Sequence, residues 1–440
     1  MSFQAWFESL ENPGRRWPLT DVIYRDPDSG SLLDVVHDVD ALKARSADEW
    51  KALFDSRYRR SAWPYGSGVW GKKEWVYPQI ADESIVSLFE GGENLFWADR
   101  LGQQLGLDDL WIKQCGNNQT GSFKDLGMTV LVSAVREMIR QGKEIRAVAC
   151  ASTGDTSAAL SAYCAAAGLK AIVFLPKNKI STAQLIQPLA NGAEVIALET
   201  DFDGCMEIVQ KVTESHGIYL ANSMNPLRLE GQKTVAIEIV QQFDWSPVDF
   251  VIVPGGNLGN IYAFAKGFQL LLDTGILKRA PRLVCAQAEH ANPLYRAYLN
   301  GFESFEPIVA GPTQASAIRI GNPVSYPRAV RALRAFDGIV EQASEDELAN
   351  ASARADRTGL FNCPHTGVAL AALQKLVDRG VIQRHHRVVV ISTAHGLKFV
   401  EHKVGYHSAE LPEVTPRYRN VPHDLPADID HVMRTLDRLI

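Results

Sequence analysis

The sequence predicts an α/β protein with two doubly wound domains, an N-terminal extension and a C-terminal tail. From about residue 146 onward, short apolar segments alternate with stretches whose apolar residues recur at helical spacing. Several of the short segments are apolar throughout, as in parallel strands that helices cover on both faces. The series is also too long for one sheet of ordinary width, so we expect two sheets with right-handed crossovers.

Each strand is predicted where an apolar run ends at a turn or polar residue. The predicted strands cover residues 146–151, 171–176, 194–199, 218–222, 249–254, 282–288 and 387–393. The predicted helices cover residues 156–168, 181–191, 203–214, 229–243, 259–274, 345–358 and 365–379. Gly168 is expected to close the first of these helices, because glycine readily adopts the left-handed conformation that ends a helix.

The two ends of the chain do not follow this alternation. Residues 1–90 contain clusters of Pro, Trp and Tyr and one helical stretch over 39–54. The last residues are punctuated by proline before an amphipathic helix over 427–439. The predicted organisation is an extension over 1–90, a large domain over 91–128 and 222–405, a small domain over 129–221 and a tail over 406–440.

Composition excludes several classes of protein. The 440 residues include 45 Lys+Arg and 51 Asp+Glu, a net charge of −6, with 22% charged and 46% hydrophobic residues. This is ordinary globular composition, without the basic excess expected for binding nucleic acid or an anionic membrane. No apolar run approaches the roughly 18 residues of a membrane span. The first twenty residues contain two glutamates and no apolar run, unlike a signal or transit peptide, so we expect a cytoplasmic protein.

The cysteines give no sign of a metal site. The six stand singly, as Cys115, Cys150, Cys164, Cys205, Cys285 and Cys363. There is no CxxC pair and no HExxH motif, so we expect no bound metal. Buried free thiols in a reducing compartment are the expected state.

A glycine-rich loop, PGGNLGN (254–260), lies between a predicted strand and a predicted helix. Successive glycines let backbone N–H groups converge on an anion, and the helix N-terminus adds a partial positive charge. A dinucleotide site would need an acidic residue about 20 positions on, where the sequence reads GILKRA. The loop therefore favours a phosphate group over NAD, with an unliganded turn as the alternative. Another glycine segment, GSGVWGKK (66–73), lacks the hydroxyl that ends a P-loop motif, so no nucleoside triphosphate site is expected.

The loop CASTGDTSAAL (150–160) is rich in hydroxyls at the start of a helix. Ser152, Thr153 and Thr156, together with the first-turn amides, are suited to hold a carboxylate. The alternative is an ordinary capped helix start, with Thr153 or Asp155 as the N-cap.

Lys124 lies in TGSFKDLGM (120–128), between a Gly-Ser pair and an apolar helix. A lysine at a helix start is usually solvated. If it instead faced a semi-apolar cleft, burial would lower its pKa and free the amine to attack an aldehyde.

Two further segments end predicted strands with polar groups. In NSMNPLRLEGQKT (222–234), Asn222, Ser223 and Arg228 form a compact set, and arginine offers a two-pronged donor to an oxyanion. STAHGLK (392–398) carries hydroxyls at the tip of the last strand.

Taken together in this order, these segments resemble the pyridoxal-phosphate enzymes of the tryptophan-synthase-β fold type (fold type II), and specifically the plant-type threonine synthases. The resemblance covers about residues 20–405. It rests on TGSFKDLGM, ASTGDTSAALSAYCAAAG, NSMNPLRLEGQKT, VPGGNLGNI, ASAIRIGNPVS, CPHTGVA and STAHGLK. It implies a lyase of threonine biosynthesis that uses pyridoxal 5′-phosphate. The implied reaction converts O-phospho-L-homoserine and water to L-threonine and phosphate by β,γ-elimination and β-addition.

The resemblance also implies a role for each matching residue. Lys124 would bind the aldehyde of the cofactor and shuttle protons, with Phe123 beside the ring and Thr393 facing the pyridine nitrogen. The cofactor phosphate would be bound by the backbone amides of Gly256, Asn257, Leu258, Gly259 and Asn260. The substrate carboxylate would be bound by Ser152, Thr153 and Thr156, and the substrate phosphate by Asn222 and Arg228.

Asp155 departs from the pattern of many bacterial members of the family, in which an asparagine contacts the 3′-oxygen of the cofactor. The plant-type branch has an aspartate, as here. Two anionic oxygens in contact repel, so either a proton lies between them or Asp155 points elsewhere.

The family also implies an effector and an assembly. Plant-type members are activated by S-adenosylmethionine near a segment that Trp63, Pro64 and Tyr65 match here, and members form homodimers. Two alternatives stay open: another lyase of the same fold, such as a threonine or serine dehydratase or a cysteine synthase, and a catalytically idle homologue that binds a metabolite. Arg228 favours a phosphorylated substrate over the first, and Lys124, Thr393 and the glycine loop are arguments against the second.

Overall fold

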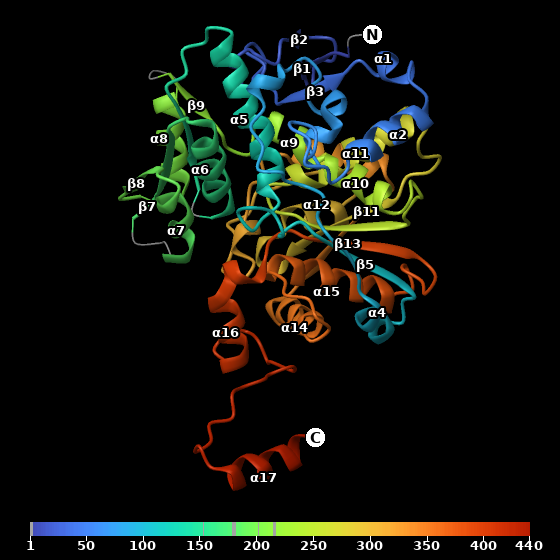
Figure 1. Ribbon diagram of the computed structural model, residues 1–440, viewed down its shortest axis with the longest axis vertical. Coiled ribbons are helices and arrows are strands. Elements are labelled where there is room, and N and C mark those ends of the chain that lie inside the picture. The colour runs from blue at the N-terminus through green and yellow to red at the C-terminus, as the bar shows by residue number, and fades with distance from the viewer. Residues whose placement is uncertain (1–2, 153, 178–181, 201, 214–216) are drawn as a thin grey trace.

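The structure is a computed structural model, and it describes residues 3–152, 154–177, 182–200, 202–213 and 217–440. The strands form a three-stranded, a six-stranded and a four-stranded sheet. Helices pack around the two larger sheets, and a C-terminal arm extends away from the body (Figure 1). The predicted α/β architecture with two parallel sheets is confirmed.

The six-stranded sheet has the order β12-β11-β10-β13-β5-β4. Its strands are parallel, except that β4 pairs antiparallel with β5 at one edge. They are β4 (Leu95–Trp97), β5 (Asp109–Gln114), β10 (Phe250–Pro254), β11 (Arg282–Ala288), β12 (Ile339–Ala343) and β13 (Arg387–Ser392). Strand β10 is buried along its whole length, as expected for a strand covered on both faces.

The helices outside the four-stranded sheet follow the same chain order. They are α4 (Asp99–Leu105), α5 (Lys124–Arg140), α9 (Leu227–Gln232), α10 (Thr234–Gln242), α11 (Gly259–Asp273), α12 (Pro293–Leu299), α13 (Tyr326–Ala335), α14 (Glu345–Asp356) and α15 (Pro364–Asp378). Short 3-10 turns are η3 (Glu289–Ala291), η4 (Ser316–Ile318) and η5 (Gly396–Phe399). Helix α15 packs against β10, β11, β12 and β13.

The four-stranded parallel sheet has the order β8-β7-β6-β9. Its elements are β6 (Ala147–Ala151), α6 (Asp155–Ala167), β7 (Ala171–Pro176), α7 (Thr182–Ala190), β8 (Glu194–Leu198), α8 (Phe202–Thr213) and β9 (Ile218–Leu220). They agree with the predicted series to within one or two residues. Helix α6 is closed by Gly168, with φ of 69°, as predicted.

Helix α5 lies between the two larger sheets, because it packs against both α6 and α9. The predicted boundary between the large and small domains, at residues 128 and 129, falls inside this helix. The domain limits as a whole stay a prediction.

The N-terminal region contains an antiparallel sheet that the sequence analysis did not predict. Its order is β2-β1-β3, and its elements are β1 (Ala5–Ser9), β2 (Arg16–Trp17), β3 (Leu33–His37), α1 (Val39–Lys43), α2 (Ala47–Arg57), η1 (Trp70–Lys72), α3 (Lys73–Val76) and η2 (Asp82–Ser84). The helix predicted over 39–54 is divided in two. Ser46 forms a capping box with Glu49, which begins a new helix at that point.

The helix predicted over 229–243 is also divided, into α9 and α10. Helix α9 lies unusually close to α5: a Cβ on Gly231 would lie 1.7 Å from the carbonyl oxygen of Leu126. This contact brings the loop at the start of α9 towards the start of α5.

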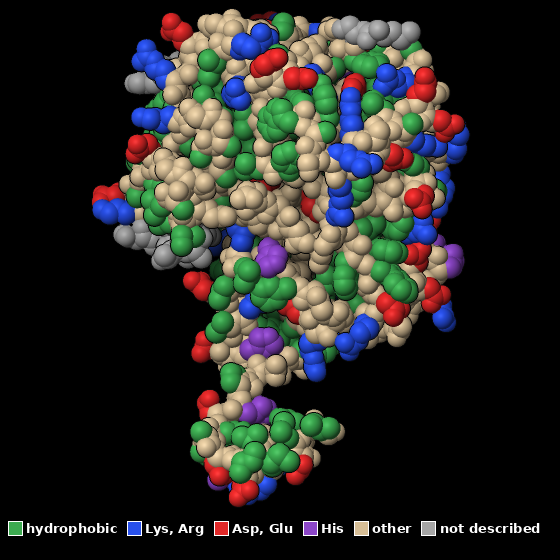
Figure 2. All heavy atoms as spheres, in the orientation of Figure 1, with side chains coloured by type: hydrophobic (Ala, Val, Ile, Leu, Met, Phe, Trp, Pro, Cys, Tyr) green, Lys and Arg blue, Asp and Glu red, His purple; other side chains and the backbone are tan. Residues whose placement is uncertain are grey.

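The tail consists of α16 (Val400–Ser408), an extended arm and α17 (Ile429–Leu439). The arm first packs on α14, where Arg417 pairs with Asp346 at 2.9 Å. Helix α17 then stands apart from the body (Figure 1) and exposes hydrophobic side chains, visible in Figure 2. The sequence predicted this helix to within two residues.

All six cysteines are buried free thiols, as predicted. In the ranges that the structure describes, no helix has both the length and the apolar character needed to cross a bilayer. The same ranges contain no group of three His, Cys, Asp or Glu side chains suited to a metal ion.

Candidate active site

Lys124 lies at the first position of α5, after the loop that follows β5. This loop is bonded to the segment after β13: Phe123 N–H donates to the Thr393 carbonyl, and His395 N–H to the Gly121 carbonyl, both at 2.9 Å. Strands β5 and β13 are parallel neighbours, and ligands of open parallel sheets bind beyond the carboxyl ends of the strands. The structure therefore brings Phe123, Lys124 and Thr393 together at that edge.

The environment of Lys124 suits a nucleophilic amine. Its Nζ lies 4.1 Å from the centre of the Phe123 ring, and no hydrogen-bond acceptor of the described residues contacts it. Burial lowers the pKa of Lys124 to about 7; the cations of Arg228 and Lys398 lower it further, and Asp155 opposes them. A large fraction of the amine is therefore neutral near pH 7, and the neutral amine is the form that attacks an aldehyde.

The glycine loop joins β10 to α11, as predicted. Leu258 is the N-cap of α11 and has φ of 66°, a left-handed conformation that few side chains adopt. A Cβ on Gly256 would lie 2.8 Å from the Cα of Ile318. The loop is thus a tight turn that depends on the missing side chain of Gly256.

The loop presents free amides at the N-terminus of a long helix. The N–H groups of Gly256, Asn257 and Leu258 have no acceptor among the residues described. The side chain of Asn257 donates to Ser223 Oγ at 2.9 Å, and that of Asn260 donates to the Pro254 carbonyl at 2.7 Å, which hold the turn in place. Free amides at a helix start bind phosphate. Together with the amine of Lys124, they fit pyridoxal phosphate, which carries both a phosphate and an aldehyde.

Thr393 is supported by a segment to which sequence reasoning gave no role. Its Oγ1 lies 3.8 Å from Cys363 Sγ, and that sulfur lies 3.4 Å from His365 Nδ1 and 3.1 Å from Thr366 Oγ1. Burial raises the pKa of Cys363, but His365 and Thr366 outweigh it and lower the pKa to about 7. The CPHTGVA motif therefore packs a polarised thiol behind the Thr393 hydroxyl.

Arg228, on α9, carries a buried guanidinium without a carboxylate partner among the described residues. The residue is 3% exposed, and its Nε has no hydrogen-bond partner. Nη1 donates to the Ala221 carbonyl at 3.3 Å and Nη2 to Thr156 Oγ1 at 3.5 Å, both long contacts. Burial lowers the pKa of Arg228 to about 10, so it stays cationic at neutral pH. A buried, unpaired cation is costly unless an anion joins it.

The hydroxyl loop after β6 is described in part. Helix α6 begins at Asp155 with Gly154 as its N-cap, so Asp155 is not the N-cap. Ser152 Oγ accepts from Gly154 N–H at 3.2 Å, and Thr156 faces Arg228 as given above. Thr153 lies outside the described residues.

Asn222 and Asp155 have partners within the chain. The Asn222 amide accepts from Ala151 N–H at 3.1 Å and donates to the Ala151 carbonyl at 3.0 Å, which ties the segment after β9 to the end of β6. Asp155 Oδ1 forms a 2.8 Å ion pair with Lys398. Burial raises the pKa of Asp155, but Lys398 outweighs it and the net pKa is lowered. Asp155 is therefore ionised and points to a cation that sequence reasoning did not assign, although Lys398 lies in the STAHGLK motif.

Trp63, Pro64 and Tyr65 lie in the N-terminal region. Trp63 is 56% exposed, and Tyr65 donates from its hydroxyl to Asp82 Oδ2 at 2.6 Å. Arg57 covers the Tyr65 ring at 4.5 Å from its centre. These contacts stay within residues 1–90.

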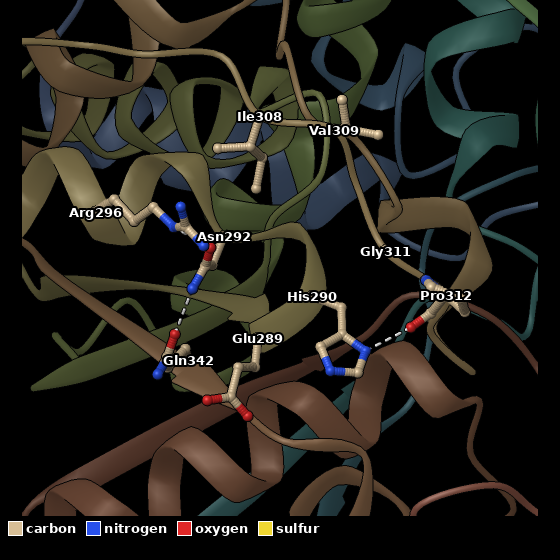
Figure 3. Close-up of a pocket in the computed structure, with 9 residues that line it drawn as sticks. All are labelled: Glu289, His290, Asn292, Arg296, Ile308, Val309, Gly311, Pro312 and Gln342. Carbon is tan, nitrogen blue, oxygen red and sulfur yellow. Dashed lines mark hydrogen bonds between the residues drawn. The ribbon is translucent and has the colours of Figure 1, made fainter.

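A separate open cavity of about 850 Å³ lies beyond the carboxyl ends of β11 and β12, and none of the predicted site residues line it. Its polar side chains are largely bonded to its own wall (Figure 3). Asn292 donates to Gln342 Oε1 at 2.6 Å, and His290 is bonded to the Pro312 carbonyl at 2.7 Å. The chemistry is therefore assigned to the smaller space around Lys124, where the reactive amine and the free amides meet.

Comparison with known proteins agrees with this assignment. A family model described as "Pyridoxal-phosphate dependent enzyme" matches residues 86–394. The chain is 59% identical to Threonine synthase 2, chloroplastic, of Arabidopsis thaliana, over 98% of this chain and 84% of the relative. It is 40% identical to a threonine synthase of Methanocaldococcus jannaschii, over 88% of this chain and 91% of the relative. A solved structure of Escherichia coli threonine synthase shares the fold, with a TM-score of 0.67, 20% identity, and coverage of 99% of this chain and 100% of that chain.

The expectation of a cytoplasmic protein is wrong. The relative from Arabidopsis thaliana, 59% identical over 98% of this chain, is chloroplastic. A compartment is read from targeting segments that take no part in the folded core, so the two early glutamates did not determine it.

Proposed function

Because the chain belongs to the pyridoxal-phosphate-dependent enzymes and, within them, to the threonine synthases, we propose that it converts O-phospho-L-homoserine and water to L-threonine and phosphate. It is a lyase of threonine biosynthesis, and pyridoxal 5′-phosphate is its cofactor.

The unpaired guanidinium of Arg228 is the observation that supports this substrate. It is buried, cationic and without a carboxylate partner among the described residues, and it is one of the charges that lower the Lys124 pKa. A substrate with a phosphate as well as a carboxylate needs a second anion site near the reactive amine. A dehydratase or a cysteine synthase needs no such second site, so Arg228 favours the phosphorylated substrate.

Each residue has a task in this proposal. When bound, the cofactor supplies an electron sink that makes protons of the substrate acidic. Lys124 takes and returns those protons, since its lowered pKa suits transfer near neutral pH. The amides of Gly256–Asn260 hold the cofactor phosphate, and Phe123 packs beside its ring.

Thr393 would face the pyridine nitrogen. A hydroxyl does not hold that nitrogen protonated as a carboxylate would, so the electron sink is moderate, which suits elimination over transamination.

Ser152, Thr153 and Thr156 bind the substrate carboxylate in this proposal, and Arg228 binds the phosphate that leaves. The side-chain amide of Asn222 already bonds to the backbone of Ala151. Its part in phosphate binding therefore stays the least supported of these roles.

Phosphate release from O-phospho-L-homoserine, measured beside L-serine and L-threonine as substrates, tests the proposal. We expect phosphate and threonine from the first substrate and little product from the other two. Turnover of L-serine or L-threonine alone would instead identify a dehydratase. The idle homologue predicts no turnover at all, and the low pKa of Lys124 is an argument against it.

Two finer proposals follow from the family resemblance. We propose a homodimer, which sedentary mass measurement by light scattering tests directly. We also propose that S-adenosylmethionine activates the enzyme from a site near Trp63, Pro64 and Tyr65. Kinetics unchanged by saturating S-adenosylmethionine would remove this second proposal, because activation requires the effector to bind two states unequally.

A further inference from the structure

Lys398 connects the two larger sheets beside the candidate active site. It lies in η5, after β13, and its side chain is 18% exposed. Its Nζ lies 2.8 Å from Asp155 Oδ1, 2.9 Å from the Thr120 carbonyl and 3.0 Å from Gln187 Oε1. Asp155 begins α6 and Gln187 lies in α7, both on the four-stranded sheet. Thr120 lies in the loop before Lys124.

We propose that Lys398 is a positioning residue for the reaction: its ammonium ties α6 and α7 to the loop that carries Lys124, and it pairs with the Asp155 carboxylate at the position assigned to the cofactor's 3′-oxygen. The inference rests on the proposed function, because it concerns the same site.

The path of the Lys398 side chain is built into the loop. A Cβ on Gly121 would lie 3.0 Å from Lys398 Cδ, and Gly121 has φ of 79°. The absence of a side chain there leaves room for the lysine to cross. On its other side the loop is held by Asp125, whose Oδ2 accepts from Thr120 N–H at 2.8 Å. Thr120 is therefore fixed between Asp125 of α5 and Lys398 of η5.

Pairing with Lys398 resolves the charge conflict at Asp155. An ionised carboxylate beside an anionic oxygen is repelled, but a carboxylate that shares a lysine ammonium presents little net charge. The ammonium also bonds to two neutral oxygens, those of Thr120 and Gln187. A buried ion pair with its remaining hydrogen bonds satisfied is the kind that holds a defined geometry.

The charges that face Lys124 are Arg228 from α9, Asp155 from α6 and Lys398 from η5. Those that face Asp155 are Lys398, Lys124 and His365 of α15. Removal of the Lys398 charge deletes one cation near Lys124 and leaves Asp155 unpaired. Both changes raise the pKa of Lys124, by about one unit for a neighbouring charge of this kind.

Three variants of the holoenzyme test the proposal. Lys398→Met removes the ammonium, and Lys398→Arg keeps a cation. Lys403→Met is the matched control, because Lys403 is 12% exposed and pairs with Asp356 without reaching the four-stranded sheet. Hydrogen exchange is measured on peptides from the start of α6 and from α7, and the pH profile of kcat/KM is measured beside it.

We expect Lys398→Met to exchange faster in both peptides and to move the acid limb of the profile up by about one pH unit. Lys398→Arg should largely restore both readouts, and Lys403→Met should leave both as in the wild type. Wild-type exchange and an unmoved acid limb in Lys398→Met would overturn the inference, as would equal changes in Lys403→Met.

If Lys398→Met does not fold, Gln187→Leu provides the test, because it removes one contact of the ammonium. It should speed exchange of α7 alone, and unchanged exchange there would overturn the inference. Hydrogen exchange needs no turnover, so its result stands apart from wild-type phosphate release. A wild-type chain that releases no phosphate refutes the proposed function, not the connection through Lys398.

Discussion

Replacement of Arg228 by methionine removes the guanidinium while keeping a long apolar side chain in its place. In the wild type, Nε has no partner and both Nη contacts, at 3.3 and 3.5 Å, are long. The donors are therefore available to an incoming phosphate. Arg228→Lys keeps the charge but loses the two-pronged geometry, so it should give an intermediate result.

The size of the effect follows from two charged hydrogen bonds to the leaving phosphate. Each contributes about 1.5–3 kcal/mol, so loss of both costs about 3–6 kcal/mol. At about 1.4 kcal/mol per tenfold, kcat/KM should fall by roughly 10²- to 10⁴-fold. Loss of this cation also raises the pKa of Lys124, so the acid limb of the pH profile should move upward.

Stability should change in the opposite sense to activity. A buried charge without a partner destabilises the free protein, so Arg228→Met should unfold at a higher temperature than the wild type. Inorganic phosphate should raise the Tm of the wild type and not that of the variant. The matched control is Arg328→Met, because Arg328 is also buried but donates to Ser325 Oγ at 3.2 Å and lies near Asp34. This control should lower the Tm and leave KM unchanged.

The assay is phosphate release from O-phospho-L-homoserine at varied substrate concentration, with thermal unfolding in parallel. A kcat/KM within about threefold of the wild type, less than 1 kcal/mol, would refute the assignment of Arg228. Loss of bound cofactor would instead reassign Arg228 to the cofactor site.

Three further outcomes are expected. Lys124→Ala should lose the visible absorption of the bound cofactor and turnover together, and a colourless but active variant would contradict the role of Lys124. Wild-type activity should fall as the pH drops through about 7, because Lys124 is protonated there, and a profile flat down to pH 5 would contradict this. Gly256→Ala should weaken cofactor binding by about tenfold or more, since the new Cβ would lie 2.8 Å from the Ile318 Cα; equilibrium titration with cofactor measures this. Burial lowers the pKa of His402 from 6.5 to about 3, so its contribution to stability is complete above pH 6.5 and is lost as the pH falls towards 3, at about 1.4 kcal/mol per pH unit. Denaturant unfolding of His402→Leu should show a shallower loss than the wild type over that range, and an equal slope would count against a neutral His402.

The repeating α/β series was predictable because its signals are local. Runs such as AIVFLP and RLVCAQA are apolar throughout, and the structure forms β7 and β11 over the same residues. Buried parallel strands need apolar side chains on both faces, which leaves a clear pattern in the sequence. Strand β12, IVEQA, carries Glu341 and Gln342 and was missed, because its identity as a strand depends on pairing with β11.

The N-terminal sheet was missed for a similar reason. Its strand β2 is only the pair Arg16–Trp17, and β1 reaches β3 across more than twenty residues. Such pairing is a long-range event that local composition does not determine. The division of the helix predicted over 39–54 depended on the capping box of Ser46 and Glu49, which a pattern of apolar residues alone does not reveal.

The sequence by itself determined the family, the cofactor and the parts of the site, because the glycine turn, the Lys124 segment and the Arg228 segment are each continuous motifs. Tertiary structure alone decided which of these groups are paired: Asp155 with Lys398, Asn222 with the backbone of Ala151, and Arg228 with no carboxylate among the described residues. The physical reason is that the charge state and availability of a side chain depend on burial and on neighbours from distant segments. Those neighbours meet only when the two larger sheets pack together around α5.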